Sequence, residues 1–102
     1  VQYLDDLSQV AAFEKHKKLM NEADFIMCDA PKDGVFEEKF YRLLAGLQLT
    51  KKPRWLFLDD IRFPSEMLSW RRVQSPKIDL TSFGHFSGTG LVDISEGLKF
   101  YD

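Results

Sequence analysis

The sequence predicts an α/β fold, in which helices cover a layered sheet. Two segments with apolar residues at three- and four-residue spacing predict amphipathic helices, and two short apolar runs predict strands. These segments alternate along the chain, as they do where helices connect the parallel strands of a sheet. The last two expected strands follow each other directly, which indicates an antiparallel pair at a sheet edge. The expected order is helix, strand, helix, strand, helix, strand, strand.

The first half of the chain predicts two helices around one strand. Residues 6–22 form the first expected helix, whose lysines we expect on a solvated face. Residues 24–29 are a short apolar run bounded by acids, which predicts a buried strand, and residues 30–34 have the composition of a turn. Residues 35–48 carry apolar side chains at intervals of four, three and four, which predicts the second helix.

The second half predicts one further helix and three strands. Residues 54–58 are continuously apolar after Arg54, a pattern typical of strands covered on both faces. A short helix is expected around residues 67–73, and Ser75-Pro76 ends it. The alternation in residues 78–83 and the apolar run 91–94 predict two strands joined by a glycine-rich connection.

Composition restricts the class of protein. The 102 residues include 14 basic and 16 acidic side chains, so the net charge is 14 minus 16, or −2, without the basic excess of a nucleic-acid binder. A hydrophobic content of 44% is enough for a packed core. The one cysteine, Cys28, excludes an internal disulfide, which favours a cytoplasmic location. The longest apolar run, 55–58, is far shorter than a membrane span, so we expect no membrane partner.

Acidic residues follow two of the expected strands. Asp29 comes directly after the first strand, and Asp59 and Asp60 end the second. Ligands of open parallel sheets bind beyond the carboxyl ends of the strands, so these acids lie where a site is expected. Clustered carboxylates repel one another unless a proton or cation neutralises them, and oxygen ligands favour a hard ion such as Mg²⁺. The alternative is structural: Asp29 starts a loop, and Asp59 or Asp60 caps the next helix.

Other candidate motifs are weaker. The segment Gly88-Thr89-Gly90 is not a dinucleotide-binding loop, because Asp93 stands where the third glycine would be. His85 lies between loop residues and either positions a substrate or packs within the turn. His16 is expected to face solvent, and Cys28 to be a small buried hydrophobe. Three aromatic side chains are expected in the core instead of stacking on a substrate: Trp55, Trp70 and Phe86.

Several segments together resemble a known family. The segment Asp24 to Asp29 with Ala30-Pro31-Lys32, followed by Trp55 to Asp60, resembles the fourth and fifth strands of class I S-adenosylmethionine-dependent O-methyltransferases. Residues 70–79 and 84–90 look like the sixth and seventh strands of bacterial members. The resemblance implies the C-terminal half of a Rossmann-like methyltransferase sheet with an antiparallel last strand. The family's first strand, its glycine-rich loop and the acid after its second strand have no counterpart among the 102 residues.

The resemblance also implies functions for individual residues. Asp29, Asp59 and Asp60 would hold Mg²⁺, as in the cation-dependent branch that acts on small molecules, and Asp29 would also lie near the S-adenosylmethionine cofactor. Lys32 and His85 would handle the proton or the charge of the acceptor. Residues 1–102 would then be a single partial domain that lacks the N-terminal cofactor-binding half and is inactive alone. The implied reaction is an in-line methyl transfer to a hydroxyl of a small substrate.

The alternative function is a non-catalytic α/β module. A half-sheet of this kind leaves the edge of its first strand unpaired, and apolar edges invite pairing. We therefore expect such a module to associate with itself or with another chain through that exposed sheet edge.

Overall fold

A computed structural model describes residues 5–29, 35–62, 64–81 and 88–101. Their helices and strands follow one another in the predicted order. The elements are α1 (Val10–Glu22), β1 (Phe25–Cys28), α2 (Phe36–Gly46), β2 (Trp55–Asp59), α3 (Met67–Arg72), β3 (Lys77–Asp79) and β4 (Thr89–Asp93).

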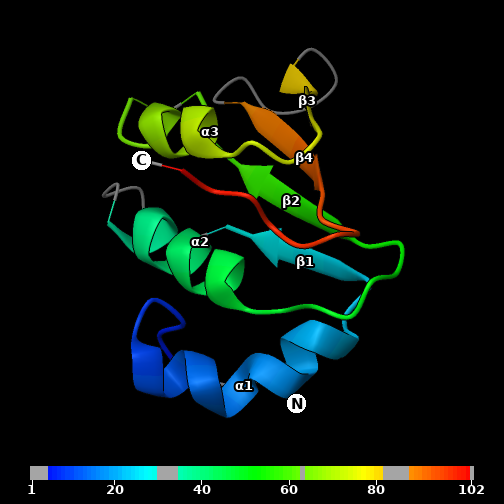
Figure 1. The fold of residues 1–102 in the computed structure, drawn as a ribbon. Coiled ribbons are helices and arrows are strands. Elements are labelled where there is room, and N and C mark those ends of the chain that lie inside the picture. The colour runs from blue at the N-terminus through cyan, green and yellow to red at the C-terminus, as the bar shows by residue number, and fades with distance from the viewer. Residues whose placement is uncertain (1–4, 30–34, 63, 82–87, 102) are drawn as a thin grey trace.

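The four strands form one mixed sheet in the order β1-β2-β4-β3 (Figure 1). Strand β1 pairs with β2 in parallel, with Phe25 opposite Trp55 and Cys28 opposite Leu58. Strand β4 is antiparallel to both of its neighbours, β2 and β3. The α/β class and the antiparallel last strands are therefore confirmed, and β1 and β3 form the two edges of this sheet.

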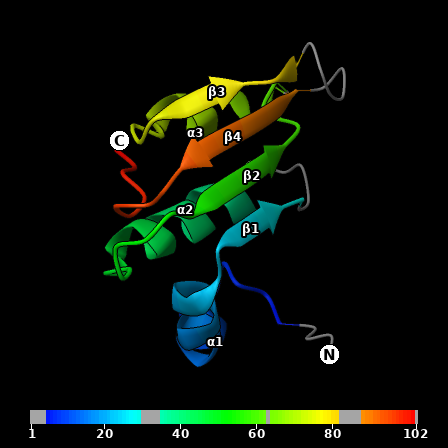
Figure 2. The same ribbon diagram turned by 90° about the vertical axis from the view of Figure 1, so that its right-hand side faces the viewer.

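The described helices cover only one face of the sheet. Leu56, Leu58 and Val92 point to this face and are at most 1% exposed. They belong to the hydrophobic core, together with Phe40 and Leu44 of α2. Figure 2 views the sheet from its other side, with α2 and α3 behind the strands. The prediction that the strand at 54–58 is covered on both faces is therefore wrong, because alternate residues of β2 are exposed or half-buried.

The first helix is shorter than predicted. It begins at Val10 instead of residue 6, because the Asp6 carboxylate accepts hydrogen bonds from the Ser8 N–H (2.9 Å) and hydroxyl (2.6 Å), which closes a turn before the helix. Phe13 is buried, but Val10 remains 63% exposed. The prediction for His16 is also wrong: its side chain is only 11% exposed, and its Nε2 lies 2.6 Å from an Asp5 carboxylate oxygen. Among the described helices, none has the length and apolar character needed to cross a membrane.

A glycine of β4 makes room for an aromatic ring. A Cβ atom on Gly90 would lie 2.6 Å from the ring of Trp70, so only a residue without a side chain fits there. The ring also carries the Lys77 ammonium 4.7 Å from its centre. The second glycine of the Gly-Thr-Gly segment thus serves the packing of α3 on the sheet.

Arg54 connects the end of α1 to the start of β2. Its side chain is fully buried, and its guanidinium donates hydrogen bonds to four backbone carbonyls. Three of them belong to the C-terminal end of α1 and the residue after it, where helix carbonyls lack partners within the helix. The acceptors and distances are Met20 (3.3 Å), Asn21 (2.9 Å), Ala23 (3.3 Å) and Thr50 (2.6 Å).

Replacing Arg54 should destabilise the fold strongly. Arg54→Met removes the cation and leaves buried carbonyls without their donor, so we expect the free energy of unfolding to fall by about 3 kcal/mol or more. Arg54→Lys should lose less, since an ammonium still satisfies some of these carbonyls. Urea denaturation measures both changes. The control is Arg71→Met, at an exposed position of α3, which should change stability by at most about 0.5 kcal/mol.

Candidate metal centre

The structure brings three carboxylates together at the carboxyl ends of β1 and β2. One oxygen from each of Asp29, Asp59 and Asp60 lies within 4.8 Å of the others. The parallel pairing explains this, because Cys28 lies opposite Leu58 and the next residues along the two strands are Asp29 and Asp59. We call these three residues the Asp triad.

The backbone holds Asp60 in an unusual conformation. Its φ angle is 59°, in the left-handed region that Asp and Asn tolerate better than most residues. Its N–H donates to the carbonyl of Gly88 (2.7 Å) and to the Asp59 carboxylate (3.0 Å). Gly88 itself has a φ of 106°, and a Cβ there would lie 2.7 Å from the backbone nitrogen of Arg62. The turn after β2 and the start of β4 therefore hold each other in place.

The helix-capping alternative for the triad is wrong for the second strand. Helix α3 begins after Glu66, which occupies its N-cap position. Asp59 and Asp60 lie six or more residues before it in the sequence, so neither occupies the N-cap position. The triad is therefore a cluster of acids at the ends of the strands.

Arg62, in the turn after the triad, bonds to another strand. Its guanidinium donates to the Asp79 carboxylate (2.7 and 3.1 Å) and to the Thr81 hydroxyl (3.1 Å).

This arrangement suits a hard divalent cation. Asp29 is exposed, and Asp59 and Asp60 are half-buried, so the carboxylates are open to solvent on one side. Mg²⁺ commonly takes a few protein carboxylates and keeps several waters, which matches three acids at an open rim. A cation would also relieve the repulsion between three neighbouring negative charges.

Buried polar groups lie next to this rim and were not predicted from the sequence. Glu37 and Glu66 are each only 4% exposed, and Tyr41 is 3% exposed. The Tyr41 hydroxyl donates to the Cys28 sulfur at 3.9 Å, one residue before Asp29. Burial raises the pKa of Tyr41 well above its usual value, and the nearby Cys28 and the two glutamates raise it further. Their position near the start of a helix does not predict this burial, because Glu38 lies in the same first turn of α2 and is not buried. Cys28 itself is buried, as predicted.

A small apolar cavity of about 170 Å³ adjoins Asp29. It lies between α1, α2 and β1 and exposes mainly carbon to a bound molecule. Its lining consists of Leu7, Met20, Ile26, Met27, Cys28, Asp29, Phe36 and Phe40. A bound molecule with an oxygen near the triad would be able to place an apolar group against this lining.

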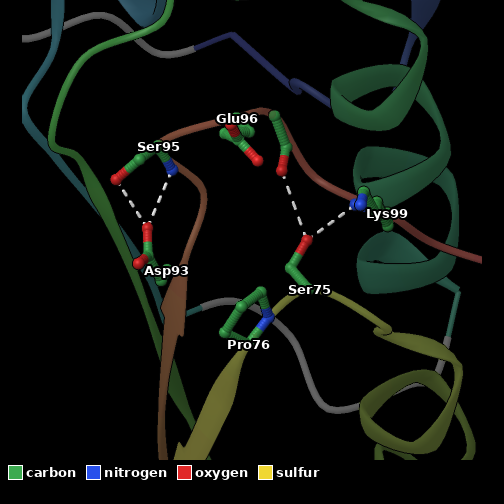
Figure 3. A pocket seen from close by; sticks show the side chains of 7 residues that line it. Ser75, Pro76, Asp93, Ser95, Glu96 and Lys99 are labelled. Atoms are coloured by element: carbon green, nitrogen blue, oxygen red, sulfur yellow. Dashed lines mark hydrogen bonds between the residues drawn. The ribbon is translucent and has the colours of Figure 1, made fainter.

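A larger hollow lies at the opposite end of the strands (Figure 3). It measures about 320 Å³, and its polar groups bond to one another. The Asp93 carboxylate accepts from the Ser95 N–H (2.9 Å) and hydroxyl (2.6 Å). The Ser75 hydroxyl donates to the Gly97 carbonyl (3.2 Å) and accepts from the Lys99 N–H (2.8 Å). These bonds explain the turns that surround the hollow and require no ligand.

Two predicted site residues and one aromatic residue lie outside the described part of the chain: Lys32, His85 and Phe86. The expectation that Trp55 belongs to the core is wrong, because its side chain lies on the uncovered sheet face and is 41% exposed. Trp70 does pack against the core, as expected.

Alkaline pH should destabilise the protein through Tyr41. Above about pH 10 tyrosine ionises in the unfolded chain but stays protonated in the fold, because its folded pKa is higher. The free energy of unfolding should therefore fall as pH rises above 10, by up to about 1.4 kcal/mol per pH unit for this group. Tyr41→Phe should remove that contribution, as measured by urea denaturation between pH 9 and 11. The control is Tyr101→Phe, which removes the same hydroxyl group from an exposed side chain.

The chain was compared with models of protein families, with curated proteins and with solved structures. No family model matches it. No curated protein and no solved structure matches it either. The observations that bear on function are therefore the Asp triad, its surroundings and the topology of the sheet.

Proposed function

We propose that this chain carries the metal and acceptor side of an S-adenosylmethionine-dependent methyltransferase that transfers a methyl group to an oxygen of a small hydroxylated substrate. The observation that supports it most directly is the Asp triad, whose oxygens lie within 4.8 Å of one another at the ends of two parallel strands. The strand order β1-β2-β4-β3, with an antiparallel last pair, is compatible with a fragment of a Rossmann-like sheet.

The residues of the triad fit a divalent cation. All three donors are carboxylates on one rim, and the exposure of Asp29 leaves space for water and for an acceptor oxygen. When bound, Mg²⁺ would supply a Lewis acid that lowers the pKa of an acceptor hydroxyl. The surrounding backbone has a structural role, because the hydrogen bonds of Asp60 to Gly88 and Asp59 keep the ligand atoms in position.

Other parts of the chain would bind and orient the acceptor. The apolar cavity beside Asp29 offers a wall for an apolar ring or chain that carries the hydroxyl. Lys32 and His85 are proposed to take up the hydroxyl proton, on the strength of the family resemblance. The glycine-rich loop that holds the methionine part of the cofactor in that family is not among these residues.

Metal binding tests the triad directly. Titration calorimetry with Mg²⁺ and with Mn²⁺ should show one site, and Asp59→Asn should weaken it at least about tenfold, because it removes one of three charged ligands. The matched control is Asp79→Asn, which removes an acid that is paired with Arg62 at the edge of the sheet. Equal affinity of the parent and Asp59→Asn chains, with folding verified by circular dichroism, would contradict the triad as a metal site.

Cofactor binding separates the two classes of function. We expect the isolated chain to bind S-adenosylmethionine weakly, since it lacks a glycine-rich loop to cradle the methionine part. Micromolar affinity in a calorimetric titration would show a cofactor site within these residues and exclude the non-catalytic alternative. Product formation needs the cofactor-binding half in the same assay, so the absence of turnover by this chain alone is expected under either class.

The second candidate function is an interaction module without catalysis. It is favoured by one observation, the apolar face of the sheet that the described helices leave uncovered. Phe25 and Met27 on β1 are 54% and 59% exposed, although β1 is an edge strand of an otherwise well-packed fold. Such a surface is unusual for a protein that works alone.

A further inference from the structure

The sheet face opposite the helices is an exposed apolar surface. Alternate residues of all four strands point to it, since side chains two positions apart share a face. Phe25, Trp55 and Ile78 are 54%, 41% and 55% exposed there, and Met27 is 59% exposed. We call this surface the bare face, and its residues are Phe25, Met27, Trp55, Phe57, Ile78 and Leu91.

The bare face is continuous across the strands. The register places Phe25 beside Trp55, and Met27 in line with Phe57 and Leu91. Ile78 extends this second row to the far edge, opposite Leu91. The rings of Phe25 and Phe57 lie 6.1 Å apart, which links the two rows. In Figure 2 this face is turned toward the viewer.

Both ends of the bare face are acidic. Asp29 and Asp59 continue the same alternation and lie at one end, two residues beyond Met27 and Phe57. At the other end Asp93 lies opposite Trp55. The face is therefore an apolar strip with Asp29 and Asp59 at one end and Asp93 at the other.

We propose that the bare face docks an amphipathic α-helix whose apolar stripe carries lysine or arginine at both ends. An apolar stripe would cover the aromatic and aliphatic side chains, and its terminal cations would face Asp93 and the Asp triad. Strands of four or five residues span about 13–17 Å, which a helix of about ten residues matches. A helical layer on the second face is also the usual way in which sheets with parallel strands are covered.

A second copy of the chain fits this surface poorly. Two bare faces packed against each other would bring acid against acid at both ends, whichever way the strands run. Anionic lipid surfaces are disfavoured by the same carboxylates.

The probe is a synthetic helix of about 18 residues with leucine on one face and lysine at both ends. Titrated into the 102-residue chain without divalent cations, it should shift the emission of Trp55 to shorter wavelength as the ring loses water. A peptide with glutamate in place of lysine should bind at least about tenfold more weakly. Rising salt should weaken the lysine peptide.

Substitutions locate the binding site. Met27→Lys adds a cation to the bare face on the edge strand β1 and should weaken binding of the lysine peptide at least about tenfold. Ile78→Lys, on the opposite edge strand β3, is the second variant if the first fails to fold. Val10→Lys, 63% exposed on α1, is the matched control and should change nothing. Trp55→Phe should abolish the fluorescence change, whereas calorimetry should still detect the peptide.

Three results would overturn the proposal. One is no binding of the lysine peptide, and another is equal binding of the lysine and glutamate peptides. The third is a dimer in sedimentation that Met27→Lys dissociates, because the occupant of the bare face would then be a second copy.

Discussion

The buried guanidinium of Arg54 fixes how α1, β1 and β2 lie relative to one another. It bonds to carbonyls at and just after the end of α1, which two residues separate from β1, and Arg54 itself directly precedes β2. The next backbone bond, from the Trp55 N–H to the Asp24 carbonyl at 2.9 Å, begins the parallel ladder. The register that follows brings Asp29 and Asp59 to the same level. A slip by one residue would turn every side chain of β1 to the opposite face and separate these carboxylates.

The order of the elements and the position of the acids could be predicted from the sequence, because both depend on local patterns. The spacing of Phe36, Phe40, Leu43 and Leu47 predicts α2, and Asp29 and Asp59 directly follow apolar runs. The bare face could not be predicted. A strand that is covered on both faces and one that leaves apolar side chains exposed have the same continuous apolar sequence, as β2 does. The sequence specifies which residues are apolar, but it does not show whether another surface covers them.

Buried charge was equally hard to foresee. Arg54 stands next to Pro53 in a polar connection, where a basic residue is normally solvated. Its burial depends on the carbonyls of α1, which are distant in sequence. The local sequence around Glu37 and Glu66 also does not distinguish them from the exposed acids of other helices. Contacts between residues that are distant in sequence determine whether these side chains are buried. Such contacts can be seen in the folded structure but not in local sequence patterns.

The left-handed backbone of Asp60 limits what evolution can place at this position. A residue with φ near 59° is tolerated mainly as Asp, Asn or Gly. Of these, only Asp keeps the third negative charge, and Asn keeps an oxygen without the charge. We therefore expect position 60 to be Asp or Asn in relatives. The rim would then carry three negative charges or two, with the backbone conformation unchanged. The choice at this single site would change the affinity of the rim for the proposed cation without altering the rest of the fold.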